Sequence, residues 1–217
     1  EAVDFAHKQG VLHRDIKPAN VLMNRYGRPL LADFNISFQS ADEDSSVGDR
    51  FGGTLAYMSP EHLEAFHPAT DTPPDVVDEQ SDIYSLGIVL HELLTGEFPL
   101  ASPPRSDNPV KNLERYAAVR SLAAPEVIAG AGDARKAFSY IVSRCLEPNP
   151  EDRFATGAEL AVALDGCRQL RAHERKARNN SRMLSAIQRH PVRWVILLAL
   201  LPQVLGSVFN ISYNLLE

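Results

Sequence analysis

The sequence predicts a mainly α-helical domain with one small β-hairpin, followed by one transmembrane helix. Three observations predict this fold: segments whose apolar residues recur at helical spacing, two short apolar runs on either side of a turn, and a long uncharged stretch near the C-terminus. The chain has 217 residues, of which 44% are apolar, so it is long enough to bury a hydrophobic core. It begins with Glu1 inside an apolar pattern, and we expect the start of a longer protein to precede it.

The first third of the chain is expected to contain the end of a helix and then the hairpin. Gly10 can end the opening helix. The runs VLM at 21–23 and LLA at 30–32 are strand candidates, and the turn NRYGRP between them contains a glycine and a proline. Residues 35–56 are polar and glycine-rich, and a loop of that length inside a domain is usually functional.

The second half of the chain is predicted to be helical. The segment 82–96 is apolar on nearly every side and closes with Gly96, so we expect a buried central helix there. In 134–146 the apolar residues follow the spacing of an amphipathic helix. Thr156 and Glu159 form a capping box for a further helix, which we expect to continue into the basic segment that follows.

An uncharged stretch of 23 residues runs from Trp194 to Leu216 and opens with WVILLALL. An α-helix of this length crosses the hydrocarbon core of a membrane, so we predict a single membrane-spanning helix. The alternative is an apolar helix packed on the domain, which Pro202 and the amide side chains of Gln203, Asn210 and Asn214 leave open.

Charge is distributed unevenly along the chain. Residues 1–167 carry 14 basic and 26 acidic side chains, whereas 168–193 carry eight basic side chains and one acidic side chain, Glu174. A basic segment beside a spanning helix is expected on the cytoplasmic side, which would place residues 1–193 in the cytoplasm and Glu217 on the far side. The acidic body argues against nucleic acid as a partner.

The cysteines and histidines do not indicate a metal centre. Cys145 and Cys167 have no paired ligand spacing and fall at apolar positions of helical patterns, so we expect buried, reduced thiols. The seven histidines form no H-x-x-x-H pair, which argues against zinc.

Two polar segments, HRDIKPAN and ADFNIS, carry the residues suited to chemistry. Asp15, Asn20 and Asp33 offer the oxygen ligands that Mg²⁺ prefers, and Lys17 adds a positive charge two residues from Asp15. A hairpin between the segments would bring them side by side. That arrangement suits phosphoryl transfer, in which a protein mainly positions the reactants and neutralises charge.

The segment HRDIKPAN resembles the catalytic loop H-R-D-x-K-x-x-N of eukaryotic-type protein kinases. Further matches follow in the family's order: D-F-x at Asp33, Gly53-Thr54, Ser59-Pro60-Glu61, DIYSLG from Asp82, and Arg153. The chain looks like the C-terminal lobe of a bacterial, membrane-anchored serine/threonine kinase whose N-terminal lobe is missing. The resemblance implies a kinase lobe at 1–170, a basic juxtamembrane segment at 171–193 and the transmembrane helix at 194–216.

This resemblance implies a role for each residue of the catalytic loop. Asp15 would be the catalytic base, Lys17 would steady the γ-phosphate, and Thr54 would bridge these two residues. Asn20 and Asp33 would hold Mg²⁺ at the phosphates of ATP. The substrates would be proteins, with a serine or threonine hydroxyl as the acceptor.

Other residues are assigned by the resemblance to the fold. Glu61 and Arg153 would form a buried ion pair. Asp82 would accept hydrogen bonds from the backbone of the catalytic loop at a helix N-terminus. His13 and Phe34 are expected to be packing groups.

Arg14, next to the catalytic base, suggests control by phosphorylation. A phosphate on the loop that follows Asp33 would pair with Arg14 and order that loop. The candidate acceptors are Ser37, Ser45 and Ser46. The alternative is that SADEDSS is a flexible acidic loop.

The chain departs from the family pattern in two ways. Asn35 stands where the family usually has glycine, and asparagine tolerates the positive φ that glycine would supply. No glycine-rich phosphate loop, cleft lysine or partner glutamate precedes the catalytic loop, so we expect the chain alone to be inactive. A pseudokinase or membrane-anchored binding scaffold is the alternative function, a small-molecule kinase is a third, and a homodimer stays open.

Overall fold

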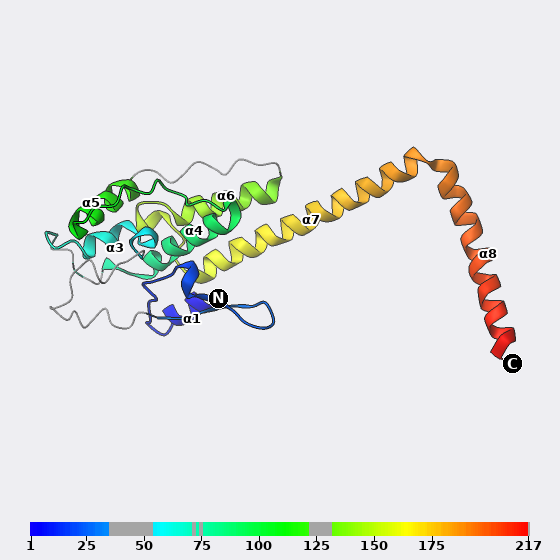
Figure 1. The fold of residues 1–217 in the computed structure, drawn as a ribbon, viewed down its shortest axis with the longest axis horizontal. Helices are drawn as coiled ribbons and strands as arrows, with labels where there is room; N and C mark the ends of the chain where they lie inside the picture. The colour runs from blue at the N-terminus through cyan, green and yellow to red at the C-terminus, as the bar shows by residue number, and fades with distance from the viewer. Residues whose placement is uncertain (35–53, 71–72, 74–75, 122–131, 217) are drawn as a thin grey trace. The chain divides into compact units, whose positions relative to one another are not determined.

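The computed structural model describes residues 1–34, 54–70, 73, 76–121 and 132–216. In chain order its helices and strands are α1 (Ala2–His7), η1 (Pro18–Asn20), β1 (Val21–Met23), β2 (Pro29–Leu31), η3 (Thr54–Tyr57), α3 (Pro60–Ala65), α4 (Glu79–Thr95), α5 (Pro109–Arg120), α6 (Asp133–Cys145), η5 (Pro150–Asp152), α7 (Gly157–Arg189) and α8 (Pro191–Leu216). They divide into two compact units, Glu1–Arg168 and Gln169–Glu217. The predicted mainly α-helical fold with one small hairpin is confirmed (Figure 1).

Helix α4 is the buried central helix that the sequence predicts. Its N-cap Asp78 accepts a hydrogen bond from the backbone N–H of Gln80, which satisfies a donor that the first turn leaves free. Most of its residues from Ser81 to His91 are buried. Gly96 ends the helix at φ 76°, a left-handed conformation that glycine adopts without steric cost.

Helix α6 packs directly on α4 (Figure 1). Ile83 of α4 joins Ile141 and Cys145 of α6 in one core cluster. Gly87 permits this close approach, because a Cβ at that position would lie 2.6 Å from the Cβ of Cys145. Both cysteines are buried and free, as predicted, and burial raises the pKa of the Cys145 thiol to about 12.

The predicted hairpin is present near the N-terminus. Strands β1 and β2 pair antiparallel, with Val21 opposite Leu31 and Leu22 opposite Leu30. Gly27 takes φ 71° in the turn between them. The second strand begins at Pro29, one residue earlier than the predicted run.

Helix α7 begins with the threonine half of the predicted capping box, and the Glu159 carboxylate caps the residue before Thr156 instead of Thr156 itself. The backbone N–H of Glu159 donates to the Thr156 hydroxyl over 3.2 Å, and the Glu159 carboxylate accepts from the backbone N–H of Ala155 over 2.9 Å. The helix then continues without a break to Arg189. The end of the predicted kinase lobe at residue 170 therefore lies inside a continuous helix.

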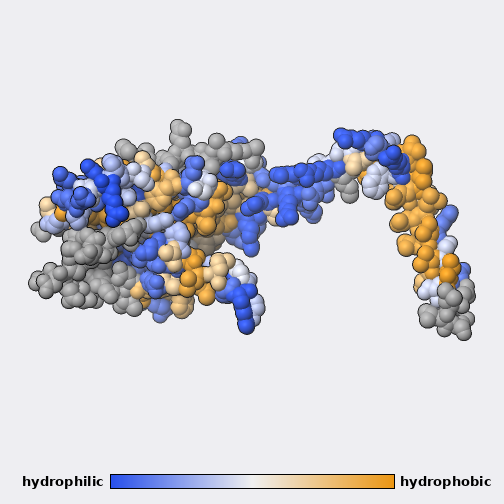
Figure 2. All heavy atoms as spheres, viewed as in Figure 1, coloured by the Kyte–Doolittle hydropathy of each residue, from blue (hydrophilic) through white to orange (hydrophobic). Residues whose placement is uncertain are grey.

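Helix α8 is the one candidate for a membrane span among the residues that the structure describes. The stretch Pro191–Ser212 is long and apolar enough to cross a bilayer, and Figure 2 shows hydrophobic side chains gathered along it. The helix begins three residues before the predicted position of Trp194, at Pro191, whose missing N–H suits a first helical turn.

Candidate active site

Asp15 lies in the loop between α1 and η1 and is held by two neighbouring side chains. Its Oδ2 atom is 2.8 Å from Lys17 Nζ and accepts a hydrogen bond from Asn20 Nδ2 over 3.0 Å. Asn20 Nδ2 also donates to the Asp15 carbonyl over 2.8 Å. The other carboxylate oxygen, Oδ1, is buried and accepts no hydrogen bond from the residues that the structure describes. One oxygen of Asp15 is therefore fixed by the protein, and the other is left as an acceptor.

Asp82, in the first turn of α4, anchors the loop that carries Asp15 through hydrogen bonds to the loop's backbone. Its two carboxylate oxygens accept the backbone N–H groups of His13 and Arg14, each over 2.8 Å. His7 Nε2 donates to the same carboxylate over 2.8 Å. Arg14 has φ 64°, an uncommon conformation for this residue type, which these contacts stabilise. The hydrogen bonds expected of Asp82 are thus present.

His13 is fully buried and joins the loop that carries Asp15 to the hairpin. Its Nδ1 accepts from the backbone N–H of Asp15 over 3.2 Å, and its Nε2 donates to the Ala32 carbonyl over 2.9 Å. This pair of contacts assigns a neutral ring with its proton on Nε2. The ring packs on Phe34 at 4.5 Å between centroids, so both residues are packing groups, as expected.

The hairpin brings the second polar segment back to the first. The Ala32 backbone N–H donates to the Asn20 carbonyl over 2.9 Å, which extends the strand pairing by one position and places Asp33 next in line. Asp33 is exposed and has φ 58°. An exposed carboxylate and the Asn20 amide oxygen form a donor set that fits Mg²⁺ shared with phosphates. No cluster of three or more His, Cys, Asp or Glu side chains suited to a metal occurs among the described residues.

Glu61 of α3 and Arg153 form the expected ion pair, with 2.7 Å from Arg153 Nη1 to the carboxylate. Arg153 is 1% exposed and also donates to the carbonyls of Glu147, Pro148 and Gln80. Burial alone would raise the pKa of the Glu61 carboxyl, but the hydrogen bonds and charge of Arg153 lower that pKa below its ordinary value. The pair joins α3 to the start of α4 and to the segment before α7.

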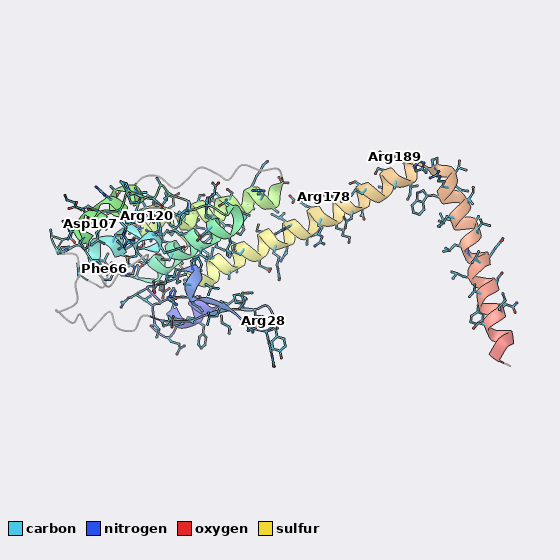
Figure 3. All side chains as sticks on the ribbon, in the orientation of Figure 1. Arg28, Phe66, Asp107, Arg120, Arg178 and Arg189 are labelled. Carbon is cyan, nitrogen blue, oxygen red and sulfur yellow. The ribbon has the colours of Figure 1, made fainter. Side chains whose placement is uncertain are left out.

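Sequence reasoning missed Arg120, the last residue of α5, which Figure 3 labels. Its side chain is 1% exposed and donates to the backbone carbonyls of Ala56 and Met58, around the end of η3. Ser85 donates to the Tyr57 carbonyl in the same segment over 2.8 Å. Burial lowers the pKa of the Arg120 guanidinium. Basic residues at helix C-termini are usually solvated, so the sequence carries no signal of this contact.

Sequence reasoning also missed that the hairpin presents an apolar surface. Leu22 is 53% exposed, Met23 64% and Leu30 52%. Leu22 lies two residues after Asn20 and opposite Leu30 on one face of the hairpin, and Met23 lies on the other face. The signal was available, because all three belong to the apolar runs used to predict the strands.

Several predicted residues lie outside what the structure describes. They are Asn35, Ser37, Ser45, Ser46 and the side chain of Thr54.

Comparison with protein families shows the family of the chain. A family model described as "Protein kinase domain" matches residues 1–165. The chain belongs to the protein kinase family. The matched range includes both polar segments, with Asp15 in the first and Asp33 in the second.

Individual protein kinases are also similar to the chain in sequence. The chain is 34% identical over 191 residues to the serine/threonine-protein kinase PknB of Mycolicibacterium smegmatis, covering 87% of this chain and 27% of that protein. It is 36% identical over 166 residues to PknB of Mycobacterium tuberculosis, covering 76% and 24%. It is 36% identical over 162 residues to PknH of the same organism, covering 75% and 23%. The chain spans about a quarter of the length of these kinases.

Proposed function

We propose that the chain forms the C-terminal side of the catalytic site of a membrane-anchored serine/threonine protein kinase. The reaction is transfer of the ATP γ-phosphoryl group to a serine or threonine hydroxyl of a protein substrate. The observation that carries the proposal is the state of Asp15: one oxygen is held by Lys17 and Asn20, and the other is buried with no hydrogen bond from the described part of the chain. A hydroxyl donor would satisfy that oxygen.

The chemistry follows from this geometry. The substrate hydroxyl donates to Asp15 Oδ1, which orients its oxygen toward the γ-phosphorus and takes the proton as the new O–P bond forms. The bond from the γ-phosphorus to the bridging oxygen breaks, and ADP leaves with that electron pair. Lys17 lies 2.8 Å from Asp15, so its charge is close to the phosphoryl oxygens during transfer.

Magnesium and ATP fit the neighbouring residues. Asn20 and Asp33 would hold Mg²⁺, which when bound neutralises charge on the ATP phosphates. The exposed Leu22 and Leu30 lie opposite each other on one face of the hairpin and offer an apolar surface on which a nucleotide base can lie. These residues would contact one side of a bound ATP molecule. The chain alone is therefore proposed to be inactive, because no glycine-rich phosphate loop is present among its 217 residues.

We also propose that α8 anchors the protein as a single-pass span, with the kinase lobe in the cytoplasm. Its length and apolar composition support the span, and the eight basic side chains of 168–193 support the orientation.

Regulation by phosphorylation remains part of the proposal. Arg14 lies beside Asp15, and phosphate on Ser37, Ser45 or Ser46 would pair with it. Mass spectrometry of the active protein tests this point, and an absence of phosphate throughout residues 35–60 would contradict it.

Phosphoamino-acid analysis tests the proposed reaction. The protein, as produced from its own gene, is incubated with Mg-ATP and a general protein substrate. Phosphoserine and phosphothreonine are expected. ATP binding without any transfer would favour the binding scaffold, and phosphotyrosine alone would contradict the proposed specificity.

A further inference from the structure

The arginines of the distal half of α7 lie on one face of the helix. They are Arg171, Arg175, Arg178, Arg182 and Arg189. At 100° per residue their directions fall within an arc of about 60°. All five are exposed, and Figure 3 labels Arg178 and Arg189 on this part of the helix. We call these five residues the arginine face.

The arginine face is unfavourable for an isolated helix. Arg171 and Arg175 are four residues apart, as are Arg178 and Arg182, and like charges at that spacing destabilise a helix. An exposed helix of about 20 residues also gains little from packing, so its stability in water is marginal. Glu174, four residues before Arg178, is the one acidic side chain of 168–193 and offsets only part of this repulsion. A negatively charged partner along this face would remove the repulsion.

The side of α7 opposite the arginine face does not offer a continuous apolar surface for membrane binding. It carries Leu170, Ala177 and Leu184, but the polar His173 and Asn180 lie between them. A side interrupted in this way is not a continuous apolar face that could enter hydrocarbon. Charge is thus the main feature available for binding.

The position of the arginine face next to the candidate membrane span indicates a membrane surface as its partner. Helix α7 ends at Arg189, and α8, the candidate span, begins two residues later at Pro191. Basic residues directly cytoplasmic of a span lie within reach of the anionic lipids of that leaflet. His190 separates the two helices, so α7 can take a direction along the membrane surface independent of α8.

We infer that the arginine face of α7 binds the headgroups of anionic phospholipids and holds the distal half of α7 along the membrane surface. This inference rests on the proposed span by α8. It adds a lipid-binding site to the chain, in which guanidinium groups pair with lipid phosphates.

Hydrogen exchange of the full chain in nanodiscs tests the inference. One set of nanodiscs contains phosphatidylcholine alone, and the other an equimolar mixture with phosphatidylglycerol. The backbone amides of 171–189 are expected to exchange about fivefold more slowly, or slower still, in the anionic bilayer, a ratio that one arginine near such a surface supplies. High salt should reduce the difference, because it screens exposed charges.

Two triple variants, each with three positive charges removed, test whether the effect depends on the arginine face or only on the net charge of the protein. The first carries Arg171→Gln, Arg178→Gln and Arg182→Gln, and the lipid-dependent difference should disappear. The matched control carries Arg105→Gln, Arg135→Gln and Lys136→Gln, which are exposed positions of the first unit, and the difference should persist.

Three results would overturn the inference. Equal exchange of 171–189 in both bilayers, with α8 protected in both, would refute lipid binding but leave the span intact. Equal slowing by soluble heparin in phosphatidylcholine nanodiscs would show a general anion site rather than a lipid site. Unprotected amides in α8 would refute the span and the inference together.

Discussion

Arg153 and Glu61, 92 residues apart in sequence, meet in a two-pronged ion pair in which Nη1 and Nη2 lie 2.7 and 2.9 Å from the two carboxylate oxygens. Arg153→Met would leave the Glu61 carboxylate buried without its partner, which costs about 3–5 kcal/mol of unfolding free energy. Urea unfolding followed by circular dichroism measures this loss. The only tryptophan, Trp194, lies in α8 and would not report on the lobe by fluorescence.

The exposed pair of Arg168 with Asp165 is the matched control for that substitution. These side chains are 81% and 45% exposed, so Arg168→Met should cost about 1 kcal/mol or less. Equal losses in the two variants would show that burial of Glu61 and Arg153 is not what makes their pair important.

The Arg153 contact was predictable and the Arg120 contact was not. Glu61, Asp82 and Arg153 belong to short motifs in a recognisable order, so their partners could be named from the sequence. Arg120 donates to the backbone carbonyls of Ala56 and Met58, more than 60 residues away in sequence. Every residue has a backbone carbonyl, so the sequence does not indicate which ones Arg120 contacts. Only the folded path of α5 past η3 reveals that contact.

The secondary structure was predictable where local patterns are strong. The buried length of α4, the capping box of α7 and the hairpin turn each depend on residues close in sequence. The break at His190 was not predicted, because the basic residues before it and the apolar residues after it suit one continuous helix. The available acceptor on Asp15 could not be predicted either, since it depends on which oxygen Lys17 and Asn20 occupy.

Arg120 is predicted to order η3. Arg120→Met removes the donors to the Ala56 and Met58 carbonyls, and a buried carbonyl without a donor costs about 1–3 kcal/mol. The amides of 54–58 should therefore exchange faster with deuterium. Arg115→Met is the control, because Arg115 lies on the same helix and donates to the Pro104 carbonyl instead. Faster exchange in both variants alike would contradict a specific role for Arg120.

His62 is predicted to make the lobe less stable as pH falls. Burial lowers the pKa of His62 to about 4 from an ordinary value of 6.5. Below pH 6.5 the unfolded chain takes up a proton that the folded chain does not, so the unfolding free energy decreases as pH falls toward 4. The slope approaches about 1.4 kcal/mol per pH unit. Denaturation between pH 6.5 and 5 measures it, above the range in which Glu61 contributes.

Of two histidines tested by substitution, only His62 should affect how the unfolding free energy changes with pH. His62→Gln should flatten it. His173→Gln, at an exposed position of α7, should leave it unchanged. An unchanged slope in His62→Gln would show that another group takes up the proton.

Two glycine substitutions are predicted to have opposite effects. Gly87→Ala would place a Cβ 2.6 Å from the Cβ of Cys145, and such overpacking costs about 1–3 kcal/mol. A Cβ at Gly166 in α7 would meet no described atom within 4 Å outside the local helix backbone, so Gly166→Ala should stabilise the helix by about 0.5–1 kcal/mol. Urea midpoints that shift in the same direction would contradict the packing of α4 on α6.

The role of Asp15 is tested most directly by the kinetics of phosphoryl transfer. The protein produced from its own gene is compared with its Asp15→Asn variant and with Asp107→Asn, an exposed control position that Figure 3 labels. With Asp15 as the proposed base, kcat of Asp15→Asn should fall about 10²- to 10⁴-fold with little change in the KM for ATP, and Asp107→Asn should match the unchanged protein. Transfer by Asp15→Asn at the unchanged rate would contradict the assignment of this loop as the catalytic centre.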